Sequence, residues 1–300
     1  VDRGDNGASG SAKNAAKNDT NKLIVEIIAL RAERARLLGY ASHAHWRMAT
    51  TMAKDPARAQ ALMMRVWPAA KARVVEEVRD MRKLARKQGA RHPIKPWDYR
   101  YYMEKVRKSR YDLDQNEFKS YFELENMIKA SYYLAERLYG YAFREITSEV
   151  KTFHPDVRVY HVTNKVDGSH VGVFYRDDFA RQYKRSGAWQ STYRGQHKVG
   201  GQVDAVVSNN NNFAKSAPGK PTLISLDDAE TLFHEFGHAL HALANDTTYP
   251  SLRSTPRDFV EFPSQVHENW VLTRDVLDKF ARHYKTNKPM PQALIDKVRR

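Results

Sequence analysis

The sequence predicts a mainly α-helical protein with a small β-sheet beside one functional helix. Apolar residues recur at helical spacing from Leu23 almost to residue 145, which is the pattern of a series of amphipathic helices. Near residue 155 the pattern changes to the alternation that is typical of β-strands. Residues 231–241 are helical again and contain two histidines four positions apart. We therefore divide the 300 residues into a segment 1–21, a helical region 22–150, and a region 151–300 with the sheet and the histidines.

The first 21 residues are rich in Gly, Ala, Asn, Lys and Ser and have no apolar period. Such a segment cannot bury a face, so we expect it to be a mobile surface segment. The first helix is predicted from Leu23 onwards, and Gly39 stands where a C-terminal cap is expected.

Proline and glycine divide the rest of the helical region. Pro56 and Pro68 are predicted to start two successive helices, because proline is favoured in a first helical turn. Gly89 and Gly140 are predicted to end helices. The region also holds many aromatic residues, which either line a peptide channel or belong to the helical core. These residues are Trp97, Tyr99, Tyr101, Tyr102, Tyr111, Tyr121, Phe122, Tyr132 and Tyr133.

The predicted sheet begins with a hairpin. Alternating apolar stretches at 157–160 and 171–175 flank an Asp-Gly turn at Asp167 and Gly168, and this arrangement predicts a β-hairpin. A further extended stretch at 203–208 leads into four asparagines at 209–212. The edge of this sheet either accepts a peptide as an added strand or only covers the core.

The composition limits the classes of function. Because the chain has no cysteine, a bound metal would be held by histidine and carboxylate. The net charge of +15 comes from basic residues interspersed with acidic ones, without a nucleic-acid-binding signature. We therefore expect no nucleic-acid partner. The sequence shows no apolar stretch long enough for a membrane span and no signal peptide, so we expect no membrane partner and a cytoplasmic location.

The pattern His-Glu-x-x-His occurs at residues 234–238. Two histidines four apart lie on one face of a helix, so His234 and His238 can reach a single ion. Ser225 followed by Asp228 resembles a capping box at the start of this helix. Its apolar residues predict a buried helix, which disagrees with the alternative of two solvent-facing surface histidines.

A catalytic metal site of this kind needs a third protein ligand. Glu261 lies among apolar residues, where a carboxylate is costly unless it is paired or binds a metal. We predict Glu261 as the third ligand, with Asp258 and Glu268 as weaker candidates. Glu235, between the two histidines, is predicted to accept a proton from an attacking water. His241 either orients a ligand or is a core histidine.

Two strings around these residues resemble the thimet oligopeptidase family of zinc metallopeptidases, most closely its peptidyl-dipeptidase Dcp branch. They are Thr-Leu-Phe-His-Glu-Phe-Gly-His-Ala-Leu-His at 231–241 and Thr-Pro-Arg-Asp-Phe-Val-Glu-Phe-Pro-Ser-Gln at 255–265. Further similar strings at 30–40, 154–159 and 184–189 extend the resemblance over nearly the whole chain from about residue 20.

The resemblance implies a large helical, zincin-like and neurolysin-like fold with two lobes and a narrow channel that admits short peptides. It implies one zinc ion held by His234, His238 and Glu261, with Glu235 as general base and Asp258 or His241 as possible supporting residues. The implied activity is release of dipeptides from C-termini by a monomer, with a basic residue that binds the substrate carboxylate. An endo-acting oligopeptidase and an inactive, zinc-holding peptide-binding module are the alternatives.

The sequence departs from the family pattern in two places. The connection at 249–256 is shorter than in the family and lacks its glycine, which affects gating and specificity. Family members are also longer, and the tyrosine and histidine groups that stabilise the oxyanion would follow Arg300. We therefore expect the chain to be incomplete at its C-terminus.

Overall fold

The computed structural model describes residues 19–111 and 115–298. It divides into two compact units, residues 1–74 with 256–258 and residues 75–255 with 259–300. Most of the segment 1–21, predicted to be mobile, lies outside the described residues. No helix in the described part of the chain is long and apolar enough to cross a membrane.

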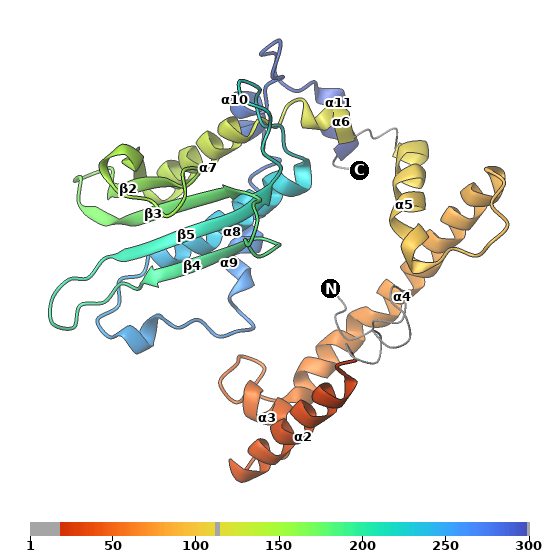
Figure 1. Ribbon diagram of the computed structural model, residues 1–300, viewed down its shortest axis with the longest axis horizontal. Coiled ribbons are helices and arrows are strands. Elements are labelled where there is room, and N and C mark those ends of the chain that lie inside the picture. Colours follow the sequence, from red (N-terminus) through yellow and green to blue (C-terminus); the bar gives the residue numbers. More distant parts are fainter. Residues whose placement is uncertain (1–18, 112–114, 299–300) are drawn as a thin grey trace. The chain divides into compact units, whose positions relative to one another are not determined.

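The first unit consists of α2 (Asn21–Leu37), α3 (His43–Met48) and the first part of α4 (Pro56–Lys87) (Figure 1). As predicted, α2 ends before Gly39, which has a φ of 78°. The side chain of Ser42 accepts a hydrogen bond from the N–H of His45 and caps α3. The apolar side chains of α2, including Leu23 and Ile28, are largely exposed.

Helix α4 starts at Pro56 as predicted, but the prediction that Pro68 starts another helix is wrong, because α4 continues through it. A proline inside a helix removes one backbone hydrogen bond and costs about 3 kcal/mol. The flanking residues offset this cost, since residues 57–87 contain no glycine and many strong helix formers such as Ala, Arg, Lys and Met.

The second unit begins with the last part of α4 and with α5 (Pro96–Tyr111), followed by α6 (Gln115–Lys119). Met81 and Ala85 of α4 form a small core with Tyr102 of α5. Of the aromatic residues noted in the sequence, Tyr102 and Phe122 are buried core residues, whereas Trp97 is largely exposed. The core interpretation therefore holds for part of this set.

The sheet has five strands: β1 (Tyr141–Glu145), β2 (Arg158–Asn164), β3 (His170–Phe179), β4 (Trp189–Arg194) and β5 (Ala205–Phe213). Their order is β1-β2-β3-β5-β4, with β3 and β5 parallel and the other neighbours antiparallel. The predicted hairpin is confirmed as β2 and β3, and the extended stretch as β5.

Two strands were not predicted. Helix α7 (Leu124–Tyr139) ends at Gly140 as expected, but β1 and the 3-10 helix η1 (Thr147–Glu149) follow, so the helical region does not continue to residue 150. Tyr141 and Phe143 of β1 alternate and pack against the core. In β4, the aromatic and β-branched residues of Trp-Gln-Ser-Thr-Tyr-Arg are the signal that was missed.

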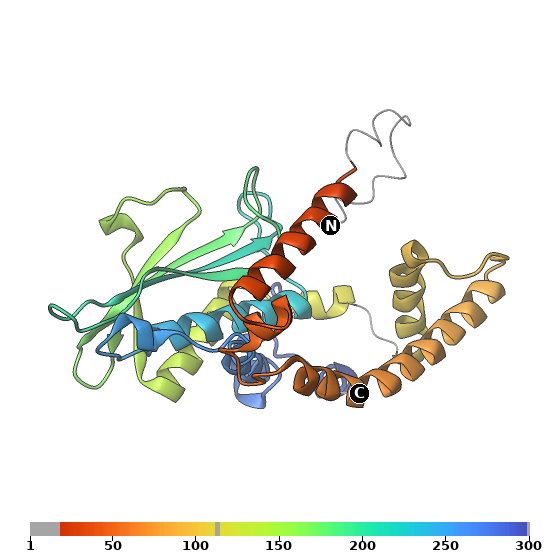
Figure 2. The ribbon, with the colours of Figure 1, turned by 90° about the horizontal axis from the view of Figure 1, so that it is seen from below.

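Helices α7 and α8 (Leu226–Leu243) cover one face of the sheet (Figures 1 and 2). Phe174 and Val207 of the sheet meet Phe236 and Leu240 of α8 in one core. A second core joins the start of α8 to the C-terminal helices. The elements after α8 are η2 (Pro250–Arg253), α9 (Glu261–Glu268), α10 (Arg274–Phe280) and α11 (Gln292–Val298).

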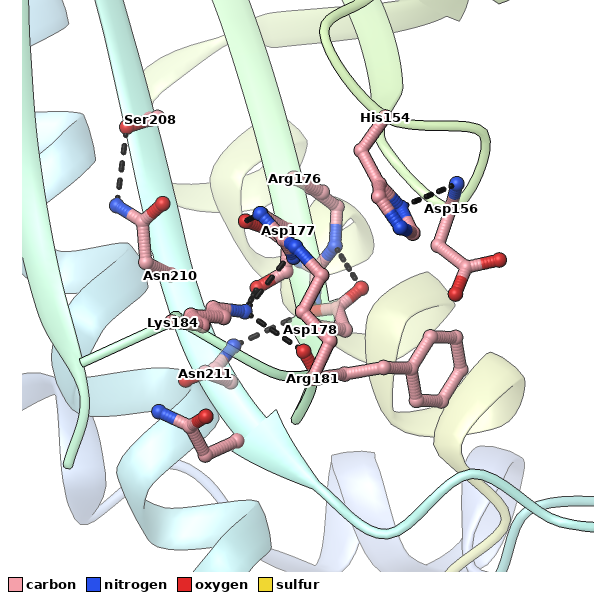
Figure 3. A network of polar contacts seen from close by, with 12 residues as sticks. His154, Asp156, Arg176, Asp177, Asp178, Arg181, Lys184, Ser208, Asn210 and Asn211 are labelled. Atoms are coloured by element: carbon pink, nitrogen blue, oxygen red, sulfur yellow. Dashed lines mark hydrogen bonds and ion pairs between the residues drawn. The ribbon is translucent and has the colours of Figure 1, made fainter. Parts of the chain in front are cut away.

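The end of β3 carries a buried polar network (Figure 3). Side chains alternate between the faces of a strand, so Arg176 and Asp178 share one face and Asp177 lies on the other. Arg176 donates two hydrogen bonds to Asp178, of 2.8 and 3.1 Å. Asp177 accepts two from Arg181, of 2.6 and 2.8 Å, and its Oδ1 lies 3.0 Å from Lys184 Nζ. The network thus fixes the segment after β3, which leads to β4.

Candidate metal centre

Helix α8 is held firmly at its start and along one side. Ser225 and Asp228 form the predicted capping box: the N–H of Asp228 donates to Ser225 Oγ at 3.1 Å, and the N–H of Ser225 donates to Asp228 Oδ2 at 2.9 Å. The predicted apolar face is buried, so the helix lies in the interior of its unit. The residues of this face are Leu232, Phe233, Phe236, Leu240 and Leu243.

The helix brings His234 and His238 together with Glu261, the first residue of α9. Glu261 Oε2 lies 3.1 Å from His238 Nε2 and 3.2 Å from His234 Nε2. One ligand atom of each residue lies within 4.8 Å of the other two, and no other group in the described part of the chain has this property. In a tetrahedral site with metal–ligand distances of about 2.0–2.2 Å, ligand atoms lie about 3.3–3.6 Å apart. The three residues therefore fit a single divalent ion.

Glu268 orients one of these imidazoles. Its Oε1 lies 2.5 Å from Nδ1 of His234, so the Nδ1–H donates to the carboxylate and the lone pair of Nε2 points away from it. Burial lowers the pKa of His238, partly offset by Glu261, which keeps this imidazole neutral and able to bind a metal. Glu268, a weaker ligand candidate in the sequence, thus contacts Nδ1 of His234, whereas Glu261 lies next to Nε2 of the same imidazole. Its spacing of seven residues from Glu261, two helical turns, places both carboxylates on the same face of α9.

A close approach of two helices sets the position of Glu261. A Cβ atom added at Gly237 would lie 2.9 Å from Cα of Ser264 and 3.0 Å from Cβ of His267, so α9 packs directly on the backbone of α8. His267 is buried, and burial lowers its pKa to about 4. It is therefore a neutral packing residue on α9, next to the rings of Phe233 and Phe236.

Glu235 projects from the same helix toward β4. Its side chain is 6% exposed, and the backbone of Gln190 in β4 lies near its carboxylate and acts against a rise in its pKa. Its Oε2 has no partner among the described residues. Burial raises the pKa of Glu235 to about 7, with His234 acting against this rise and Glu261 adding to it. A buried carboxylate with one free oxygen and such a pKa can exchange protons near neutral pH.

The structure places the two remaining candidates elsewhere. His241 is exposed and lies in the wall of a cavity next to His238, so the interpretation as a core histidine is wrong. It makes no hydrogen bond to His234 or His238 among the described residues. The carboxylate of Asp258 accepts hydrogen bonds of 2.9 Å from the backbone N–H groups of Met52 and Ala53, and these bonds lower its pKa. Asp258 thus fixes a turn of the backbone within the first unit.

The chain is similar in sequence to known peptidases. The sequence model of Peptidase family M3 matches residues 6–300. The chain is 39% identical over 285 residues to the dipeptidyl carboxypeptidase of Escherichia coli (strain K12), covering 94% of this chain and 41% of that protein. It is 35% identical over 299 residues to oligopeptidase A of the same strain, covering 97% and 43%. The chain therefore spans about two fifths of the length of these relatives.

Proposed function

Because the chain belongs to peptidase family M3, we propose that it holds one zinc ion and hydrolyses short peptides, releasing dipeptides from their C-termini. The observation that carries the proposal is the convergence of His234, His238 and Glu261 on one point. The relative named dipeptidyl carboxypeptidase supports the release of dipeptides.

The chain supplies the residues for acid–base catalysis. When bound, zinc would lower the pKa of a coordinated water toward about 7 and polarise the scissile carbonyl. Glu235, whose Oε2 has no partner among the described residues, accepts the proton of the attacking water. It then delivers this proton to the departing amine. Glu268 keeps His234 in the tautomer that binds through Nε2.

The edge of the sheet gives the substrate a place to bind. Strand β4 is the last strand in the sheet order and pairs only with β5 in the described part of the chain. Its Gln190 contacts Glu235 through the backbone, so a peptide added along the free edge of β4 lies beside the general base. This favours the peptide-binding interpretation of the edge.

Removal of metal is expected to abolish peptide hydrolysis, and added zinc is expected to restore it, because the carbonyl and the water lose their activation without the ion. A quenched fluorescent peptide measures the rate, and mass spectrometry measures the zinc content. His238→Asn is expected to lower the zinc content, whereas His92→Asn, which changes an exposed histidine outside the group, is not. Full hydrolysis by metal-free protein would refute the proposal.

An endo-acting oligopeptidase is the second candidate, because relatives named oligopeptidase A are 35% identical to the chain. The two activities differ in how the end of the substrate is held. A dipeptide-releasing enzyme is expected to lose most of its activity when the C-terminus of a test peptide is amidated. Mass spectrometry of the products distinguishes the two, since equal cleavage of acid and amide would favour the endo-acting enzyme.

A further inference from the structure

A cavity of about 410 Å³ adjoins the candidate metal centre. Its wall includes His238 and Gln190, which also belong to the centre. The rest of the wall comes from Thr192 of β4 and the two residues after this strand, the end of α8 with Asn245, residues of the stretch 250–255, and Val260. Cavities of this size bind small ligands or side chains, so a peptide bound at the metal would have part of its length in or next to this cavity.

The wall of the cavity carries one strong cation and no acidic residue. Arg253 is the only lysine or arginine that lines it, and neither aspartate nor glutamate does. Arg253 has no ion pair or hydrogen bond among the described residues. The charge of Arg253 is therefore available to a ligand.

The backbone of Gly195 determines where the guanidinium lies. A Cβ atom added at Gly195 would be 1.6 Å from Nη1 of Arg253, so the guanidinium rests on the glycine directly after β4. Arg253 belongs to the connection at 249–256, which lacks the glycine of the family pattern. This connection therefore contributes a cation to the cavity.

Gln196 adds an unused donor to the same wall. It is 4% exposed, and its Oε1 accepts a 2.8 Å hydrogen bond from the N–H of Thr247, which fixes the orientation of the amide. Its Nε2 is buried and has no acceptor among the described residues. A buried donor without a partner is destabilising, so this amide is suited to a ligand that accepts hydrogen bonds.

We propose that Arg253 and Gln196 bind a carboxylate of the peptide substrate in this cavity. A guanidinium and an amide N–H are the donors that match a carboxylate, and a guanidinium can bind it through two parallel hydrogen bonds. The carboxylate is either the free C-terminus of the peptide or an acidic side chain. The inference rests on the proposed function, because it identifies the group by which the enzyme selects its peptides.

Binding to the Glu235→Gln protein tests this without turnover. Three fluorescent peptides of one sequence are compared: a free acid with one glutamate, its C-terminal amide, and the free acid with the glutamate changed to glutamine. Arg253→Met, which removes the charge and keeps an apolar side chain, is expected to weaken binding of the first peptide about 10- to 100-fold. Gly195→Ala is expected to act in the same direction, because its Cβ displaces the guanidinium. The control Arg144→Met, which breaks an exposed pair with Glu149, is expected to leave binding unchanged.

The three peptides identify the carboxylate. If the amide binds weakly and its binding no longer responds to Arg253→Met, the C-terminal carboxylate is the ligand. If instead the glutamine peptide binds weakly and no longer responds, the glutamate side chain is the ligand. Equal binding of all three peptides, or no effect of Arg253→Met on any, would overturn the inference. Hydrolysis is measured separately on the protein without the Glu235→Gln change. If that protein hydrolyses no peptide but binding still depends on Arg253, the proposed function is refuted and the inference stands.

Discussion

Glu235→Gln is expected to reduce peptide hydrolysis by about 10²- to 10⁴-fold, the usual contribution of a general base. Glutamine keeps the shape of the side chain but cannot accept the proton of the attacking water. The kcat for a quenched peptide measures the loss. Zinc content is expected to stay the same, because Glu235 is not one of the three converging residues.

The same variant is expected to be at least as stable as the original protein. Glu235 is a buried carboxylate with an unpartnered Oε2, so its charge costs folding free energy that a neutral amide does not. Thermal unfolding measures this difference. Glu136→Gln, which neutralises an exposed glutamate of α7 paired with Lys165, is the control and is expected to keep full activity. An active Glu235→Gln protein would remove the residue from its assigned role.

The sequence was sufficient for the parts of the site that local rules determine. The spacing of His234 and His238 and the capping box at Ser225 depend only on helix geometry. Glu261 was predicted because a carboxylate among apolar residues needs a partner, but its side chain is 52% exposed, so burial is not the reason for its position beside the two histidines. The contact of Glu268 with His234 and the approach of the Gln190 backbone to Glu235 could not be predicted in this way, since both join elements that meet only in the folded unit.

Tertiary structure also overrode local signals in the fold. Pro68 is a helix-starting residue by preference but lies inside α4. The four asparagines at 209–212 have low β-propensity, yet they form the second half of β5. Two of their amides are used between strands: Asn210 donates to the carbonyl of Trp189, and Asn211 donates to Asp178. The Asn209 amide has no partner among the described residues. The partners of Asn210 and Asn211 lie far away in the sequence, so the gain that offsets low propensity is not visible there.

Arg176→Met is expected to destabilise the protein by about 3–5 kcal/mol, the usual cost of breaking a buried ion pair by removing one partner. Arg176 is 1% exposed and Asp178 is 2% exposed. Without the guanidinium, Asp178 keeps only Asn211 at 3.0 Å and Arg158 at 3.6 Å. Urea unfolding at neutral pH measures the loss. Arg144→Met breaks an exposed pair and is expected to cost less than about 1 kcal/mol, so an equal cost for both would contradict the assignment.

The pH dependence gives a second, independent test of the same pair. Burial alone would raise the pKa of Asp178, but Arg176, together with Arg158 and Asn211, outweighs burial and holds the pKa below its usual value. In the original protein this ionised carboxylate therefore contributes stability above the unfolded pKa of about 4, and the contribution is lost as the pH falls through the lower folded value. In Arg176→Met burial dominates, the pKa of Asp178 lies above the unfolded value, and protonation on acidification relieves the buried charge. The difference in unfolding free energy between the two proteins is thus expected to shrink from pH 7 to pH 4. A difference that stays constant over this range would mean that lost packing of the arginine, and not the charge left on Asp178, determines the cost.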